Sequence, residues 1–360
     1  MGQQGGAGVF LCHAADVACR AIRGKRAFFM RIWSSLYDLV LKGGMRILFV
    51  TATRIGDAVL STALLDHLGR AFPEARFTIA CGPAAEGVFL RMPRREATII
   101  VEKRPRNGHW FALWRQVAPR WWDMVVDLRG SALSLTIPAR RRFIMRGGRR
   151  PGHRLVHLAG ALGISTPIAP VAWYGPEDEA RAATLIPQGA PVLALGPTAN
   201  WDGKLWPADR FVALADRMRA AQPALRIAVL AGPGEKERAL ARPVLTAIPD
   251  AIDLAGAVTL PEAAACLSRC ALFVGNDSGL MHLSAASGTP TLGLFGPTPA
   301  AEYAPAGRHA AAVMADGPPG EAPMEALAVD RVISAAEDLL RQRGMYNPGM
   351  MKDVVRRESA

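Results

Sequence analysis

The sequence predicts an α/β fold with two domains, each built around a parallel sheet. From residue 45 onward, short segments that are almost entirely apolar alternate with helical patterns. Strands that are apolar on both faces are typical of parallel sheets that helices cover on both sides. The Pro-containing segment 166–176 divides the pattern in two, and 360 residues are enough for two separate cores. We therefore expect two domains that face a central cleft.

The first domain, residues 45–170, is expected to contain five strands. Its apolar segments are short, and helical patterns separate them. The expected strands span residues 47–51, 77–80, 98–101, 124–128 and 142–145. A further helix is expected over 153–162, before the Pro-containing segment.

The second domain, residues 171–325, repeats the same alternation. Its expected strands span residues 192–195, 226–230, 252–254, 271–274, 291–295 and 311–314. A last helical pattern, 324–343, is long enough to cross back to the first domain. We therefore assign residues 326–360 to a crossing helix and a tail.

Residues 1–44 form an N-terminal extension with a distinct composition. Arginine and lysine side chains alternate with Phe, Trp and Leu at loose helical spacing. One interpretation is a basic amphipathic helix that lies on a membrane surface. The other is that translation begins at Met45, immediately before the first expected strand. Because no small-residue cleavage site follows an apolar region, export is not expected.

The positive charge is concentrated in the first half of the chain. Residues 1–172 contain 26 Lys/Arg and 10 Asp/Glu, a net charge of +16, whereas residues 173–360 have a net charge of −4. A polyanion or an anionic membrane surface would be attracted to such a domain. Arginine-rich solvated faces are the alternative explanation. The asymmetry between the halves favours an anionic partner.

The segment 273–298 is the most informative part of the chain. It reads as a strand, a Gly-flanked loop, a helix, a second strand and a second Gly loop. Parallel strands would place both loops at the carboxyl edge of one sheet, where open α/β sheets bind ligands. Ser278, Gly279 and the free N–H groups of the helix can hold a phosphate. Asp277 could orient the turn, and His282 alone would be taken for a core histidine.

Three other loops follow expected strands and carry polar groups. Asp57 could cap a helix over 58–70 or act as a general base, and Gly56 would allow close approach of a ligand. Lys204 could neutralise a pyrophosphate or point to solvent. Glu235 could cap the next helix or accept hydrogen bonds from ribose hydroxyls.

Several signatures of other enzyme classes are missing from the sequence. It contains no G-x-x-x-x-G-K-[ST] loop, no H-E-x-x-H, no Asp-x-Asp, and no G-x-G-x-x-G after the first strand. The five cysteines are scattered and lack C-x-x-C spacing, so we expect reduced, buried thiols. No metal site and no cofactor are therefore expected.

Taken together, these loops resemble a known family. The motifs R-I-G-D-A-V-L-S-T, G-P-T-A-N-x-D-G-K-L-W-P, A-G-P-G-E and V-G-N-D-S-G-L-M-H-L-S-A-A-x-G-T-P, followed by L-F-G-P-T, occur in this order. They resemble the ADP-heptose:lipopolysaccharide heptosyltransferase family, glycosyltransferase family 9. The resemblance extends from about residue 45 to about residue 305. It implies a GT-B fold of two Rossmann-like domains and an inverting, metal-independent transfer from an ADP-heptose-like donor to the anionic lipid A–core acceptor.

The resemblance also implies roles for individual residues. Asp57 would be the base and Lys204 would contact the diphosphate, with Arg54, Gly56 and Arg129 as candidates on the acceptor side. The candidates on the nucleotide-sugar side are Thr198, Asn200, Lys204, Gly232, Glu235, Asp277, Ser278, Gly279, His282, Gly296 and Thr298. The enzyme would work in the cytoplasm, peripherally on the cytoplasmic face of the inner membrane, and no nucleic-acid partner is expected.

Two other functions remain open from the sequence. A nucleotide-sugar epimerase of GT-B shape would need a further acid/base carboxylate, and the first domain offers no second candidate as well placed as Asp57. A non-catalytic protein that binds anions or nucleic acid would not need Asp57, and its affinity would fall steeply with salt.

Overall fold

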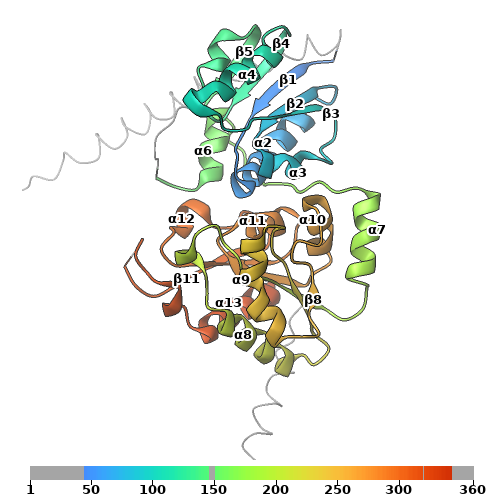
Figure 1. The fold of residues 1–360 in the computed structure, drawn as a ribbon, viewed down its shortest axis with the longest axis vertical. Helices are drawn as coiled ribbons and strands as arrows, with labels where there is room; N and C mark the ends of the chain where they lie inside the picture. Colours follow the sequence, from blue (N-terminus) through green and yellow to red (C-terminus); the bar gives the residue numbers. More distant parts are fainter. Residues whose placement is uncertain (1–43, 146–150, 319, 343–360) are drawn as a thin grey trace, which may run out of the picture.

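The computed structural model describes residues 44–145, 151–318 and 320–342. They form two α/β domains that follow one another along the long axis of the molecule (Figure 1). Each domain contains one sheet, and every described strand pairing is parallel. The predicted fold class is therefore confirmed. The predicted extension lies outside the described residues except for Gly44, and the domain bounds 45–170 and 171–325 stay predictions.

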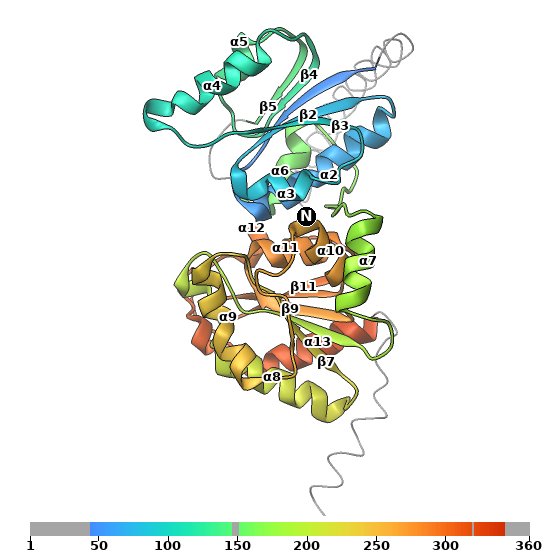
Figure 2. The ribbon, with the colours of Figure 1, turned by 45° about the vertical axis from the view of Figure 1, so that its right-hand side comes forward.

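The first sheet has the strand order β3-β2-β1-β4-β5. Its strands are β1 (Arg46–Val50), β2 (Arg76–Cys81), β3 (Arg95–Ile100), β4 (Trp122–Asp127) and β5 (Ala139–Ile144). Helices α2 (Ile55–Ala71), α3 (Glu86–Phe89) and α6 (Arg154–Ala161) cover one face, and α4 (Gly108–Val117) and α5 (Leu133–Thr136) cover the other (Figure 2). The helices change face after β3 because the strand order reverses there and the crossovers are right-handed. All five strands lie close to the predicted ranges.

The second sheet has the strand order β11-β10-β9-β6-β7-β8. Its strands are β6 (Val192–Gly196), β7 (Arg226–Val229), β8 (Ile252–Asp253), β9 (Leu272–Asn276), β10 (Thr291–Phe295) and β11 (Ala310–Met314). Its helices are α8 (Ala208–Ala221), α9 (Glu235–Ala247), α10 (Leu260–Ser268), α11 (Gly279–Ala286), α12 (Ala300–Tyr303) and α13 (Val329–Gln342). Short 3₁₀ turns occupy Pro83–Ala85, Pro105–Asn107, Asp202–Lys204 and Met324–Ala326.

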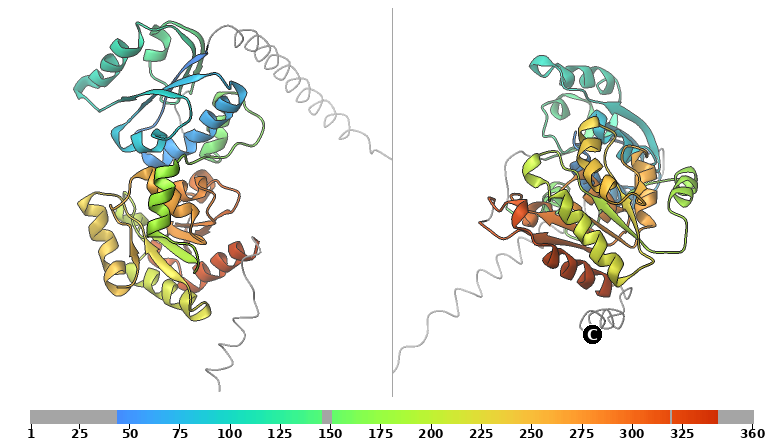
Figure 3. Two further views of the ribbon diagram at one scale, coloured as in Figure 1. Left: turned by 90° about the vertical axis from the view of Figure 1, so that its right-hand side faces the viewer. Right: turned by 60° about the horizontal axis from the view of Figure 1, so that its bottom comes forward.

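The two domains meet through helices. The N-terminal part of α2 packs on α11, and α10 contacts α3. One hydrophobic cluster extends from the α2 face of the first sheet to α10 and α11 of the second domain. Helix α7 (Pro176–Leu185), light green in Figure 3, follows the connecting segment and packs on α10. Arg91 on the first domain reaches it, with Nε 2.8 Å from Oδ2 of the buried Asp178.

The prediction for the last helix is wrong. Helix α13 does not cross back to the first domain but packs on α8, β9, β10 and β11 of the second sheet (Figure 1). Its apolar stripe of Val332, Ile333, Ala336 and Leu339 is buried in the cluster on the α8 face of that sheet. An amphipathic helix needs an apolar surface to cover, and the nearest uncovered face belonged to its own domain. Residues 343–360 lie outside the described residues.

The described part of the chain contains no helix that is both long and apolar enough to span a bilayer. The described cysteines, Cys81, Cys266 and Cys270, are free and buried, as predicted. Burial raises the pKa of Cys81 to about 12 and that of Cys266 to about 11. These thiols therefore stay protonated at neutral pH.

Candidate active site

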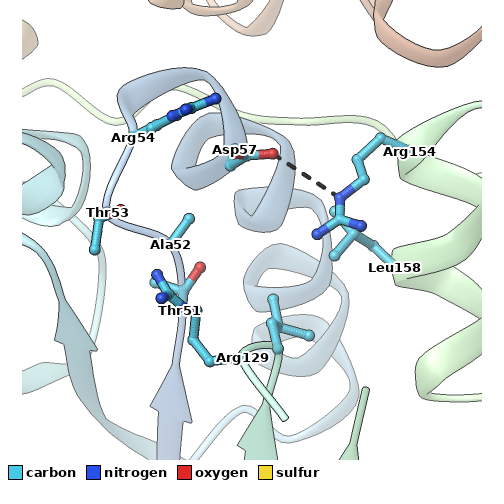
Figure 4. Close-up of a pocket in the computed structure, with 9 residues that line it drawn as sticks. Thr51, Ala52, Thr53, Arg54, Asp57, Arg129, Arg154 and Leu158 are labelled. Atoms are coloured by element: carbon cyan, nitrogen blue, oxygen red, sulfur yellow. Dashed lines mark ion pairs between the residues drawn. The ribbon is translucent and has the colours of Figure 1, made fainter. Parts of the chain in front are cut away.

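A cavity of about 300 Å³ opens at the carboxyl ends of β1 and β4 (Figure 4). Its walls come from the loop after β1, the loop after β4, the first turn of α2, and α6. The lining residues are Thr51, Ala52, Thr53, Arg54, Asp57, Leu128, Arg129, Arg154 and Leu158. The structure thus brings Asp57, Arg54 and Arg129, all predicted as site residues, into one cavity. Three arginines and one carboxylate line it, and arginine is the residue type that recognises carboxylate and phosphate groups.

Asp57 faces this cavity, and its carboxylate does not cap a helix. The prediction that Asp57 caps a helix beginning at residue 58 is wrong, because α2 begins at Ile55 and Arg54 occupies the N-cap position. Asp57 is the third residue of the helix, and its Oδ1 lies 3.9 Å from Nε of Arg154 on α6. Figure 4 shows the two side chains pointing toward each other across the cavity. Both are about one-third exposed, so a proton on a bound hydroxyl can reach the carboxylate.

Asp127 fixes the loop that carries Arg129. This fully buried carboxylate at the end of β4 accepts hydrogen bonds from the backbone N–H groups of Arg129 and Ser131, both at 2.8 Å. The hydroxyls of Ser131 and Ser134 donate to it at 2.6 Å. Four donors compensate the cost of burying the charge and give the loop one conformation.

Lys204 and Asp277 form a buried ion pair in the second domain. Nζ of Lys204, in the loop after β6, donates to Oδ2 of Asp277 at 2.6 Å. The side chain of Lys204 is 18% exposed and that of Asp277 is 7% exposed. The ammonium therefore lies at the Gly-flanked turn that the sequence predicted as a phosphate loop. It does not point to bulk solvent.

Polar atoms without a partner occur in this turn, in α11 and in the loop after β10. The hydroxyls of Ser278 and Thr298 and Nδ1 of His282 are buried and have no hydrogen-bond partner among the described residues. Ser278 is the N-cap residue of α11, yet its side chain does not cap the helix. Buried polar groups without partners are costly, so a ligand with acceptor oxygens would compensate them.

His282 lies between the two halves of the site. Burial lowers its pKa to about 4, while Asp277 and Asp57 act in the opposite direction. His153 and Lys204 also act on its charge and lower the pKa further. Charged groups of both domains are thus within electrostatic reach of one imidazole. The ring is neutral at physiological pH and can share hydrogen bonds with a ligand.

Two of the predicted glycines lie where the two domains meet. A Cβ atom at Gly56 would lie 2.9 Å from Cδ2 of His282, and one at Gly279 would lie 2.8 Å from Cβ of Ile55. These two glycines permit the close approach of α2 to α11. Gly296 is tightly packed within its own domain, because a Cβ there would lie 2.7 Å from the carbonyl oxygen of Ala322.

Glu237, which the sequence reasoning missed, ties two predicted loops together. Its Oε2 accepts from the backbone N–H of Gly232 at 2.7 Å and from the hydroxyl of Thr198 at 3.2 Å. Glu235 begins α9 and points to solvent, where Arg242 pairs with it at 3.3 Å. Asn200 is exposed. Glu237 could have been found as a second carboxylate on the first turn of a helix that follows a Gly loop.

Arg154 and Asp127 were also missed. Arg154 belongs to α6, more than 90 residues beyond Asp57, and only the packing of α6 on α2 brings the two together. Asp127 ends an apolar strand and is followed by two serines, a pattern that signals a carboxylate holding a turn. Among the described residues, no cluster of three or more His, Cys, Asp or Glu side chains is arranged to hold a metal.

The chain is similar in sequence to known heptosyltransferases. The family model "Glycosyltransferase family 9 (heptosyltransferase)" matches residues 155–325. Lipopolysaccharide heptosyltransferase 3 of Escherichia coli is 23% identical over 280 residues, which cover 68% of this chain and 81% of the relative. Lipopolysaccharide heptosyltransferase 1 of Pseudomonas aeruginosa is 29% identical over 296 residues, which cover 71% of this chain and 79% of the relative.

Solved structures of the same family share the fold. The glycosyltransferase family 9 protein of Veillonella parvula superposes with a TM-score of 0.71 at 22% identity and covers 83% of this chain and 98% of its own. The E. coli ADP-heptose lipopolysaccharide heptosyltransferase II superposes with a TM-score of 0.67 at 19% identity. The match covers 83% of this chain and 100% of that one. These likenesses confirm the predicted two-domain GT-B fold. Residues 155–325 therefore match glycosyltransferase family 9, and the chain is similar in sequence and fold to heptosyltransferases.

Proposed function

We propose that this enzyme transfers a heptose, or a related sugar, from an ADP-sugar to the core of lipopolysaccharide, with inversion at the anomeric carbon and without a metal ion. The names of the relatives support the reaction class. The geometry supports different roles for the two domains. A carboxylate lines the cavity of the first domain, and a buried ammonium with unpartnered hydroxyls lies in the second.

In this mechanism Asp57 takes the proton from the acceptor hydroxyl. The oxygen then forms a bond to the anomeric carbon while the bond to the diphosphate oxygen breaks on the opposite face. The departing diphosphate gains negative charge, which Lys204 and the N-terminus of α11 stabilise. The hydroxyls of Ser278 and Thr298 donate to its oxygens, which gives these two buried groups the partners they lack within the described residues. Thr198, Gly232 and Glu235 remain candidates for the nucleoside.

The acceptor binds in the cavity beside Asp57, where Arg54 and Arg129 meet its phosphorylated, acidic core. Arg154 holds the Asp57 carboxylate toward the cavity. Because this acceptor is anchored in lipid, the enzyme works in the cytoplasm on the inner face of the inner membrane. The surplus of positive charge in the first half of the chain supports such a partner, and nucleic acid is not part of the proposal.

The observation that carries the proposal is that the turn of α2 bearing Asp57 packs against His282 of α11, while Lys204 pairs with Asp277 just before that helix at 2.6 Å. The first test is a thermal-shift panel of the purified protein with ADP-, GDP- and UDP-sugars. We expect the ADP-sugar to raise the midpoint of thermal unfolding most, because a ligand that binds the folded protein stabilises it by mass action. The second test is transfer of radiolabelled heptose to heptose-deficient lipopolysaccharide in the presence of EDTA. Absence of both the shift and the transfer would refute the proposal.

A further inference from the structure

Helix α4 carries a row of exposed aromatic side chains on its outer face. Phe111 is 63% exposed, Trp114 is 38% exposed, and Trp121, just after the helix, is 60% exposed. Phe111 and Trp114 stack with their ring centroids 6.0 Å apart. On the neighbouring α5, Leu135 is 68% exposed. We call these four side chains the α4 aromatic surface.

The α4 aromatic surface is not needed for the core beneath it. Leu113 and Val117, on the opposite side of α4, are buried against the first sheet together with Trp122 and Leu133. Figure 2 shows α4 and α5 as the outer layer of the first domain, on the side of the sheet away from α2, α3 and α6. The exposed row therefore has no packing role among the described residues. Large exposed apolar side chains such as the stacked Phe111 and Trp114 mark an interaction site.

The stretch of chain that carries the three aromatic side chains is rich in cations and lacks carboxylates. The stretch 103–122 contains no Asp or Glu but five cations, namely Lys103, Arg104, Arg106, Arg115 and Arg120. All five are exposed, and none is paired with a carboxylate in the part of the chain that the structure describes. Aromatic rings among unpaired cations fit the interfacial region of a bilayer, where tryptophan sits at the headgroups and arginine meets lipid phosphates.

We infer that the α4 aromatic surface docks the first domain on an anionic phospholipid membrane. This inference deepens the proposed function, because it gives the domain that binds a lipid-anchored acceptor its own contact with the bilayer. It does not depend on residues 1–43 and concerns a surface separate from the cavity that holds Asp57.

Vesicle sedimentation of the full-length protein tests the inference. The probes are vesicles of phosphatidylglycerol mixed with phosphatidylcholine, and vesicles of phosphatidylcholine alone. The variant Phe111→Ser/Trp114→Ser/Trp121→Ser is expected to lose at least tenfold in partitioning to the anionic vesicles. The control Leu90→Ser/Val156→Ser, which removes exposed apolar side chains from α3 and α6, is expected to bind like the wild type. Wild-type binding by the triple variant would overturn the inference.

A charge variant tests the electrostatic part. Arg115→Gln/Arg120→Gln is expected to weaken binding to anionic vesicles roughly tenfold or more, and high salt should do the same. Arg46→Gln/Arg76→Gln is the matched control, because it removes two exposed cations from the amino edge of the same sheet. Equal loss in both variants would indicate nonspecific charge attraction and contradict a defined surface.

Three further measurements distinguish the possible outcomes. Brominated phospholipid should quench the wild-type tryptophan fluorescence, and Trp114→Phe/Trp121→Phe should remove most of that quenching.

Sedimentation velocity detects the competing occupant, a second copy of the chain. If the serine variant dissociates a dimer and keeps its vesicle binding, the inference is wrong. Transfer to detergent-dispersed acceptor should be unchanged in the serine variant, so a failure of the proposed reaction is recognised independently of vesicle binding.

Discussion

Gly56 of the first domain lies so close to His282 of the second that a Cβ atom at Gly56 would be 2.9 Å from the Cδ2 atom of the imidazole. The contact joins the first turn of α2, which carries Asp57, to α11, which follows the predicted phosphate loop. The proposed base and the proposed leaving-group site are therefore held together by a direct contact between two helices.

Gly56→Ala is expected to disturb this contact. The added methyl group must displace the buried ring or separate the helices, which should cost about 1–3 kcal/mol of unfolding free energy and lower the transfer rate. Gly160→Ala is the matched control, because Gly160 is exposed in α6 with no atom within 4 Å of the added Cβ. The control should be neutral or stabilising by up to about 1 kcal/mol. Equal behaviour of both variants in chemical denaturation would contradict a tight interface.

Lys204→Met should weaken donor binding and destabilise the fold. It leaves the carboxylate of Asp277, 7% exposed, without its partner, which costs about 3 kcal/mol. Isothermal titration with ADP should give an affinity at least tenfold lower. Lys236→Met removes the exposed pair with Asp202 and should change stability by less than about 1 kcal/mol. Unchanged ADP affinity in Lys204→Met would exclude Lys204 from the diphosphate site.

The buried His282 makes stability depend on pH. Its pKa is about 4 in the folded protein, against about 6.5 in the unfolded chain, because burial disfavours the charged form. Between these values the unfolded histidine binds a proton and the folded one does not. The unfolding free energy should therefore fall as the pH drops from 6.5 to 4, by about 3 kcal/mol at most. In the variant His282→Gln, the urea-denaturation midpoint should change less with pH across this window than in the wild type. A pH profile identical to that of the wild type would contradict the assignment.

Asp127→Ala is expected to release the loop that carries Arg129. Four donors lose their buried acceptor, so we expect a loss of about 3 kcal/mol or more. The KM for the acceptor should rise more than that for the donor, because Arg129 lines the cavity of the first domain. Ser134→Ala removes one of the four hydrogen bonds and should cost about 1 kcal/mol. If KM rises equally for both substrates, the loop has no specific part in acceptor binding.

The sequence predicts the strands and loops better than the contacts between them. Strands such as β1 and β9 are buried on both faces, so composition alone locates them within one or two residues. Loops at the carboxyl ends of parallel strands share one sheet edge, which is why Lys204 could be expected near Asp277. These features follow from local pattern and sheet topology.

Features that depend on packing could not be predicted in this way. The apolar stripe of α13 indicates burial but does not identify the surface that it covers. Asp57 is not the N-cap because α2 begins at Ile55, and helix starts are poorly specified when no strong cap residue is present. The tight space at Gly56 and Gly279 is created by the opposite domain, which no local pattern records.

Asp57→Asn tests the central claim most directly. The substitution keeps the size and polarity of the side chain but removes its ability to accept a proton. We expect heptosyl transfer to fall at least 10³-fold, while titration with the ADP-sugar gives an unchanged affinity. Transfer at the wild-type rate by a folded Asp57→Asn variant would contradict the account.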